Sequence, residues 1–203
     1  MGVNSNVLIL KNVRLSFPTL GEPEYFGGAK TKPTDKRRWS ATVLIPKDDP
    51  QRKLVDETIK FVATEKWKDK AASYLKTILT DPKASCFTDG ERKEYEGYQG
   101  MMALSAHRNE DKGRPLVIDS DKSPIYQPNG ELYEGKAGRI YSGCYVNIKV
   151  EFWAQQNTNG RGIRATLLVV QRNRDGDAFA GGVRPSDDDF EEVTEGAGAD
   201  DMT

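Results

Sequence analysis

The pattern of hydrophobic and polar positions predicts β-strands along most of the chain, with one helical region between them. Apolar residues recur at every second position, the period of a half-buried strand, in the segments 7–18, 37–46, 101–107, 115–119, 145–155 and 162–171. In the first of these segments the alternation places Ile9, Lys11, Val13, Leu15 and Phe17 on one side. Pro18 is expected to end it, and residues 19–36, rich in glycine, proline and lysine, are expected to form a loop.

Residues 50–78 carry a helical pattern. Asp48 or Asp49 can cap the first turn, where Pro50 is tolerated because no backbone donor is needed there. Apolar residues then recur at steps of three and four from Val55 to Ile78, as the buried face of a helix requires. The stripe fits one long helix or two helices joined near residues 68–70.

Several strands with a single helical region among them, and no alternation of strand and helix, predict an α+β fold that is mainly β. We expect a small antiparallel β-barrel with one long or split helix and long loops. The segments 145–155 and 162–171 flank Asn159-Gly160, a dipeptide typical of tight hairpin turns. Residues 1–183 are predicted to form one domain and residues 184–203 a flexible acidic tail, too poor in large apolar residues to fold alone.

Charge is distributed unevenly between these two parts. The chain contains 30 Lys and Arg and 31 Asp and Glu, but residues 185–203 hold eight of the acidic residues and no basic one. The rest of the chain therefore has 23 acidic against 30 basic residues, a net charge of +7, while the tail carries −8. A cationic body with an anionic tail indicates a polyanionic partner and an interaction tail, although an acidic tail can also serve solubility alone.

Other features narrow the class of protein. Cys86 and Cys144 lie far apart without CxxC spacing and are expected to be reduced, buried and apolar in role. The four apolar residues Val7–Leu10 are too few for a signal peptide or a membrane span, so we expect a cytoplasmic protein.

Candidate catalytic residues are few, and we expect a protein that is not an enzyme and needs no cofactor or metal. His107 is the chain's one histidine and has no acid or cysteine partner by spacing, so a structural role is favoured over general-base catalysis. Asp119 and Asp121 are the alternative: paired carboxylates can hold Mg²⁺ for nuclease or resolvase chemistry. Turn formation explains the same two residues more simply.

Features that suit nucleic-acid binding are more numerous. On segment 145–155, Val146 to Phe152 alternate on a core face, which leaves Tyr145, Lys149 and Trp153 on the opposite face. Aromatic rings stack on unpaired bases and cations neutralise phosphates, so these three residues are candidates for binding, with packing against another element as the alternative. Further candidates combine cations and aromatics in the same way: Lys30, Lys32, Lys36, Arg37, Arg38 and Trp39, then Arg92, Lys93, Tyr95 and Tyr98, then Arg172 and Arg174. For Trp39, strand alternation also allows a buried place.

The segment SGCYVNIKVEFWAQQNTNGRGIRATLLVVQRNRDGDAF, residues 142–179, resembles the C-terminal half of a family of phage single-stranded DNA-binding proteins, and NVRLSFP and DDPQ fit the same family. The resemblance implies an OB-fold barrel that binds single strands independently of sequence during phage replication or recombination, in the cytoplasm of a bacterial host. It also implies an acidic tail of the kind that bacterial and phage single-strand binders carry. Our hypothesis is that the eight carboxylates compete with DNA for the cations and that the freed tail recruits replication proteins such as polymerase, helicase or primase. The candidate docking segment is Asp187, Asp188, Asp189, Phe190, Glu191 and Glu192; related tails often end in an aromatic residue, whereas Phe190 here lies inside the acidic run.

Three expectations stay open from the sequence. Duplex DNA or RNA is expected to bind more weakly than single-stranded DNA, and a homodimer is compatible with the pattern. An acidic DNA mimic that acts on other DNA-binding proteins is a further alternative function.

Overall fold

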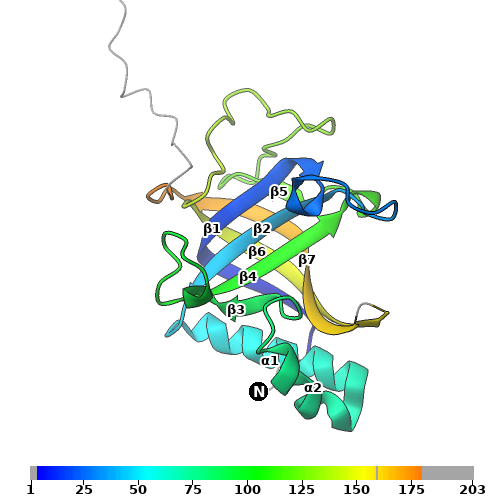
Figure 1. Ribbon diagram of the computed structural model, residues 1–203. Helices are drawn as coiled ribbons and strands as arrows, with labels where there is room; N and C mark the ends of the chain where they lie inside the picture. The colour runs from blue at the N-terminus through cyan, green and yellow to red at the C-terminus, as the bar shows by residue number, and fades with distance from the viewer. Residues whose placement is uncertain (1–3, 159, 180–203) are drawn as a thin grey trace, which may run out of the picture.

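The computed structural model describes residues 4–158 and 160–179, which form a β-barrel with two helices at one end (Figure 1). The strands are β1 (Val7–Glu24), β2 (Arg38–Pro46), β3 (Phe87–Asp89), β4 (Met101–Asn109), β5 (Leu116–Ile118), β6 (Tyr145–Asn157) and β7 (Gly160–Arg174). The helices are α1 (Pro50–Trp67) and α2 (Ala71–Ile78), with short 3₁₀ turns η1 (Phe26–Gly28), η2 (Lys68–Lys70), η3 (Gly90–Arg92) and η4 (Glu110–Lys112). The long segment between β5 and β6 lies at the end of the barrel opposite the helices (Figure 1).

Five strands close the barrel in the order β4, β2, β1, β6, β7 and back to β4, while β3 and β5 extend the sheet outside it. Neighbouring barrel strands are antiparallel except at the closure, where β4 meets β7 in parallel at His107 and Thr166. A five-stranded barrel of this kind, with β1, β2 and β4 as its first three strands, has the OB architecture. The predicted fold is confirmed, and the parallel closure makes the barrel mixed.

Strand alternation builds the core as expected. On β6, Val146, Ile148, Val150 and Phe152 are at most 1% exposed, because every second side chain points into the barrel. β6 pairs with β7 in the predicted hairpin, which ends with Asn157 opposite Gly160. Burial of such side chains stabilises the fold by about 1.5–3 kcal/mol each.

The helical region begins and divides where the sequence indicates. The Asp49 side chain accepts a hydrogen bond from the Gln51 backbone N–H (2.8 Å), and Pro50 is the first helical residue. α1 ends at Trp67 because the next residue, Lys68, has a φ of 50° that interrupts the helix, and α2 follows after η2. Buried residues from both helices pack into the core, and the Trp67 indole donates to the Gln156 side chain (2.7 Å), which ties α1 to the β6–β7 hairpin.

β1 differs from the prediction because irregularities in its register change the alternation. The register with β6 shifts between Leu10 and Val13, and the register with β2 shifts between Ser16 and Thr19. As a result Leu10, not Ile9, is buried, and Phe17 turns into solvent at 55% exposure. The strand also continues past Pro18 to Glu24, so the predicted loop is shorter, because a bulge accommodates a proline within a strand.

The structure describes both cysteines but not the acidic tail. Cys86 and Cys144 are free and buried, as expected, and burial raises the pKa of the Cys86 thiol to about 12. The acidic tail and its docking segment 187–192 lie outside the described residues, so the domain boundary at 183/184 and the tail's predicted flexibility stay predictions.

Candidate nucleic-acid interface

The outer face of β2 and β4 is a polar surface on the barrel wall, and we call it the β2–β4 face. Its cross-strand pairs are Arg38 with Asn109, Ser40 with His107, and Thr42 with Ser105. The intervening residues Trp39, Ala41 and Val43 point inward and are buried. In OB folds the second and third strands, together with the loops β1–β2 and β6–β7, are where oligonucleotides bind.

Positive charge gathers at one end of this face. Closure of the barrel at His107 and Thr166 brings Arg164, two residues before Thr166 on β7, close to His107. Burial, Arg38 and Arg164 together lower the pKa of His107 from 6.5 to about 4, and burial and Arg164 lower the pKa of Arg38. Each of these shifts shows that the arginines lie close enough to repel another cation.

Among residues 4–158 and 160–179, neither of these two arginines has a carboxylate partner. Arg164 donates to the Gln155 side chain (3.0 Å) and to the Ala84 carbonyl (2.8 Å), both neutral groups. In the part of the chain that the structure describes, neither Arg38 nor Arg164 is within 4.0 Å of an acidic oxygen. Two half-buried guanidinium groups without counter-charge, beside a neutral imidazole, form a site suited to an anion such as a phosphate.

An exposed aromatic ring stands beside Arg38. Phe26 in the β1–β2 loop is 78% exposed, and the Arg38 guanidinium carbon lies 4.4 Å from the ring centroid. Gly27 and Gly28 follow with φ of 76° and 81°, the left-handed region that glycine adopts without steric strain. Lys32 and Lys36 line the same recess over the ends of β2 and β4. Phe26 was not among the residues predicted from the sequence, although an aromatic residue before two glycines in a basic loop is a pattern that could have indicated it.

The loop cations near Phe26 differ in how far they are neutralised. Lys36 forms an ion pair with Asp111, and Arg37 forms one with Glu110 (2.9 Å), so both fasten the loop to η4. Both pairs are largely exposed and therefore weak, which leaves these cations able to exchange their partners for phosphates. Lys30 is exposed in the same loop.

Three predicted binding residues are inside the protein, which corrects the sequence reading. Trp39 is 7% exposed, and its indole donates to the Gly21 carbonyl (3.1 Å). Tyr98 is 1% exposed and hydrogen-bonds Ser16 (3.2 Å). The Arg172 side chain is 12% exposed and pairs with Asp175 (2.9 Å). Packing buries both rings, so neither can stack on a base. Arg172 is already neutralised by Asp175.

Tyr145, Arg174 and Lys149 lie away from the β2–β4 face, whereas Trp153 is the cross-strand neighbour of Arg164. The Arg174 guanidinium carbon is 3.5 Å from the Tyr145 ring centroid, so this arginine covers the ring. Lys149 on β6 pairs with Ile9 of β1. Trp153 is 40% exposed, lies opposite Arg164 in the β6–β7 register, and lines a recess with Phe61 of α1. Tyr145 and Lys149 therefore do not merge with the β2–β4 face, while Trp153 lies beside Arg164. The role of all three residues in binding stays a prediction.

The remaining candidates surround the turn between β3 and β4. Arg92 donates to the Thr80 carbonyl (3.0 Å). Tyr95 is 46% exposed, with the Lys93 ammonium 5.8 Å from its ring centroid. Tyr95 and Lys93 are thus accessible, whereas Arg92 is partly engaged by the backbone.

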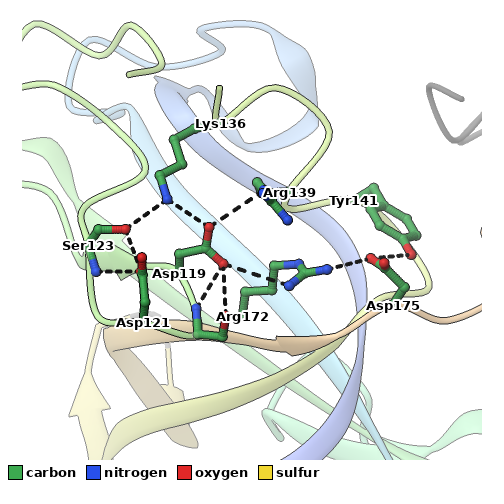
Figure 2. A network of polar contacts seen from close by, with 9 residues as sticks. Asp119, Asp121, Ser123, Lys136, Arg139, Tyr141, Arg172 and Asp175 are labelled. Carbon is green, nitrogen blue, oxygen red and sulfur yellow. Dashed lines mark hydrogen bonds and ion pairs between the residues drawn. The ribbon is translucent and has the colours of Figure 1, made fainter. Parts of the chain in front are cut away.

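Asp119 belongs to an ion-pair network that fastens the β5–β6 segment to β7 (Figure 2). It is 3% exposed and accepts a hydrogen bond from Lys136 (2.8 Å), with Arg139 at 3.6 Å and Arg172 at 3.8 Å. Burial raises the pKa of Asp119, but the bonds from Lys136 and Ser120 outweigh it and hold the pKa below its usual range.

This network argues against the nuclease alternative. Asp121 accepts hydrogen bonds from Ser123 and closes a turn, as the simpler interpretation expected. Ammonium and guanidinium groups surround Asp119 where a metal would need further oxygen ligands. Within residues 4–158 and 160–179 no group of three His, Cys, Asp or Glu side chains is placed to hold a metal ion.

Comparisons with known proteins agree with this geometry. A family model described as "Enterobacter phage Enc34, ssDNA-binding protein" matches residues 6–203. The chain belongs to this family. A relative, the p50 protein of Acyrthosiphon pisum secondary endosymbiont phage 1, is 41% identical over 189 residues, which cover 91% of this chain and 92% of that protein.

Solved structures support the same assignment. The single-stranded DNA-binding protein of bacteriophage Enc34, in complex with ssDNA, matches with a TM-score of 0.67 and 27% identity over 87% of this chain and 91% of that one. The single-stranded DNA-binding protein gp2.5 of bacteriophage T7 matches with a TM-score of 0.51 and 14% identity, over 93% and 95% of the two chains, a similarity of fold. Membership of the Enc34 family places the protein among binding proteins, not enzymes. None of the helices in the described residues is long and apolar enough to cross a membrane.

Proposed function

We propose that this protein binds single-stranded DNA independently of sequence, on the β2–β4 face. The observation that carries the proposal is the pair Arg38 and Arg164 on the outer wall of an OB barrel, beside the exposed Phe26. Neither arginine has a carboxylate partner within the described part of the chain. The arginines and the loop cations Lys30, Lys32 and Lys36 neutralise phosphates, and Phe26 stacks on a base. Each stacked base contributes about 1–3 kcal/mol whatever its identity, because every base has a π-face.

The short side chains of the face favour single strands without reading the sequence. Ser40, Thr42 and Ser105 are small, and the Thr42 and Ser105 hydroxyls already bond each other (3.0 Å), so they present few groups to base edges. A ring can stack only on a base that is not already stacked in a duplex. Duplex DNA and RNA duplexes should therefore bind more weakly through phosphate contacts alone.

Binding of fluorescent oligothymidylate across a range of salt concentrations tests this proposal. For a single strand, log K falls with log salt by about 0.7 per phosphate contact, so Arg38→Ala and Arg164→Ala should each weaken binding and reduce that slope by about 0.7. Lys53→Ala, an exposed cation on α1, is the matched control and should leave the slope unchanged. Wild-type protein that fails to bind, or a slope insensitive to both arginines, would contradict the proposal.

The acidic tail has a proposed regulatory role: its eight carboxylates compete with DNA for the cations and, when displaced, recruit replication proteins. One contact supports a tether close to the DNA. Phe179, the last described residue, is buried against Tyr98, and its ring fills the space above Gly97, where a Cβ would lie 2.3 Å from it. The described chain thus ends beside β1 and β4, a few residues before the tail begins in the sequence. A short tether gives a high local concentration of carboxylates.

Deletion of residues 185–203 tests the tail's role. The shortened protein should bind oligothymidylate more tightly at low salt, and the difference should shrink as salt rises. Unchanged or weaker affinity would argue against competition, and a body that cannot hold single strands would favour the DNA-mimic alternative. Pull-down of polymerase, helicase or primase should require Asp187–Glu192, with Phe190 as the apolar anchor.

The setting proposed for this activity is phage DNA replication or recombination in the cytoplasm of a bacterial host. Family membership supports the phage context. A homodimer is compatible with the function and is decided by sedimentation at several protein concentrations with and without DNA.

A further inference from the structure

A strained phenylalanine on the outside of β1 stands apart from the core. Ser16 pairs with Thr42 and Thr19 with Ser40, so β1 has one residue more than β2 across this bulge. Phe17 adopts φ of 46°, a left-handed conformation that is an outlier for a bulky residue. Its neighbours Leu15, Ser16 and Leu20 are buried, yet Phe17 is 55% exposed. Folding gains little from an exposed ring on a strained backbone, and such outliers cluster at functional sites, where bulges redirect a side chain.

Phe17 forms one wall of an aromatic corner, which we define as Phe17, Tyr95 and Tyr98. The Phe17 and Tyr95 centroids are 4.9 Å apart at an interplanar angle of 66°, and both rings are accessible. Tyr98 lies beneath them, 5.3 Å from Tyr95 and 6.5 Å from Phe17. Its hydroxyl bonds Ser16, which fixes the base of the corner to the bulge. Two exposed rings at a steep angle over a fixed third ring form a preorganised corner for a flat, apolar group.

The corner adjoins the β2–β4 face. Ser16, the residue before Phe17, is the register partner of Thr42 on that face. Thr42 and Arg38 are four residues apart on β2, about 13 Å along an extended strand. A strand bound at Phe26 and Arg38 and running along the face toward Thr42 would thus arrive at the corner, and Lys93 over Tyr95 supplies a cation there.

We infer that the aromatic corner is a second base-stacking site, in which an unpaired base of the bound strand stacks on Phe17 or Tyr95 and contacts the other ring by its edge. The inference rests on the proposed function and adds a binding site to it. The second stack extends the length of strand held by each barrel beyond the Arg38–Phe26 end, and accepts any base because rings have no hydrogen-bonding preference.

Phe17→Gly separates this role from stability. Glycine adopts φ of 46° without steric strain, so the melting temperature should be unchanged or higher. Affinity for oligothymidylate should fall about 5- to 150-fold through loss of one stack. The salt slope should stay at the wild-type value because no charge is removed. Phe17→Tyr, which keeps a ring, should retain wild-type affinity.

Ile9→Ala is the matched control, since Ile9 is an equally exposed apolar residue (53%) of the same strand. A photoreactive 5-iododeoxyuridine oligonucleotide provides a direct test: cross-links should map to peptides containing residue 17 or 95. Wild-type affinity in Phe17→Gly, with the Arg38→Ala effect present, would overturn the corner and leave the proposed function intact. Absence of wild-type binding would instead defeat the proposed function. If Phe17→Gly does not fold, Tyr95→Ala makes the same test from the other wall.

Discussion

His107 offers the sharpest prediction, because binding of a phosphate near it should be linked to proton uptake. Burial and the nearby Arg38 and Arg164 hold the pKa of His107 at about 4 in the free protein. A phosphate at these arginines offsets their repulsion and favours the imidazolium. Burial, the largest cause of the low pKa, remains in the complex, so we expect the pKa of His107 to rise on binding without regaining its ordinary value.

The size of the effect follows from linkage. Each unit by which bound DNA raises the pKa of His107 above about 4 strengthens binding at low pH by up to about tenfold, or about 1.4 kcal/mol. The sign is fixed: the complex binds the proton more tightly, so acid favours binding.

The assay is anisotropy of labelled oligothymidylate, whose bases do not titrate in this range, with protein lacking residues 185–203 to remove the tail carboxylates. His107 is the chain's one histidine, so its imidazole proton resonance can be followed by NMR in the same samples. His107→Gln should abolish the pH dependence between pH 7 and pH 5. A pH dependence that persists in His107→Gln, or an imidazole pKa unmoved by DNA, would refute the reasoning.

Three further predictions concern stability and reactivity. The pKa of His107 is lower in the folded state than in the unfolded state, so its contribution to the free energy of unfolding is fully present above pH 6.5 and is lost as pH falls toward 4. In urea denaturation at pH 4, His107→Gln should remove about 3 kcal/mol of this acid-induced loss. An unchanged loss in the variant would be inconsistent with the prediction. Asp119→Asn should lower the free energy of unfolding in urea by about 3 kcal/mol, because it removes the buried carboxylate that pairs with Lys136 and Arg172. The control, Asp121→Asn, should change it by less than about 1 kcal/mol. Equal effects would mean that the network does not stabilise the fold. Cys86, buried and with a pKa raised to about 12, should react with iodoacetamide only after unfolding, and mass spectrometry that finds a rapid adduct on native protein would disprove this.

The sequence predicted most of the architecture because the relevant patterns are local. Alternation on β6 identified its buried face, the Asp49-Pro50 start and the break near Lys68 bounded the helices, and Asn159-Gly160 indicated the hairpin. Each of these depends on a few neighbouring residues, which is the range over which periodicity and capping operate.

Features that depend on distant contacts could not be predicted in this way. Arg164 reaches the β2–β4 face because β7 closes the barrel against β4, a contact between residues nearly sixty positions apart. Tyr98 and Trp39 look like exposed binding residues in sequence, yet tertiary packing buries both. For Trp39 the alternation with Ala41 and Val43 did allow a buried place.

Bulges account for the errors on β1. One extra residue reverses the side to which every following side chain points, so the predicted side shared by Ile9, Val13, Leu15 and Phe17 divides into exposed and buried members. Asn12 and Phe17 adopt the left-handed conformation at the two shifts. An alternating pattern does not indicate which phenylalanine adopts a left-handed conformation. Phe17, now part of the proposed binding surface, was therefore predicted to belong to a regular strand.

The most direct test of the central claim is chemical-shift mapping of ¹⁵N-labelled protein as oligothymidylate is added. We predict that the largest changes fall on Arg38, Ser40, Thr42, Ser105 and His107 and extend to Phe26, Arg164 and Phe17. Changes confined to β6 and α1, around Lys149 and Trp153, with the β2–β4 face unaffected, would contradict the account.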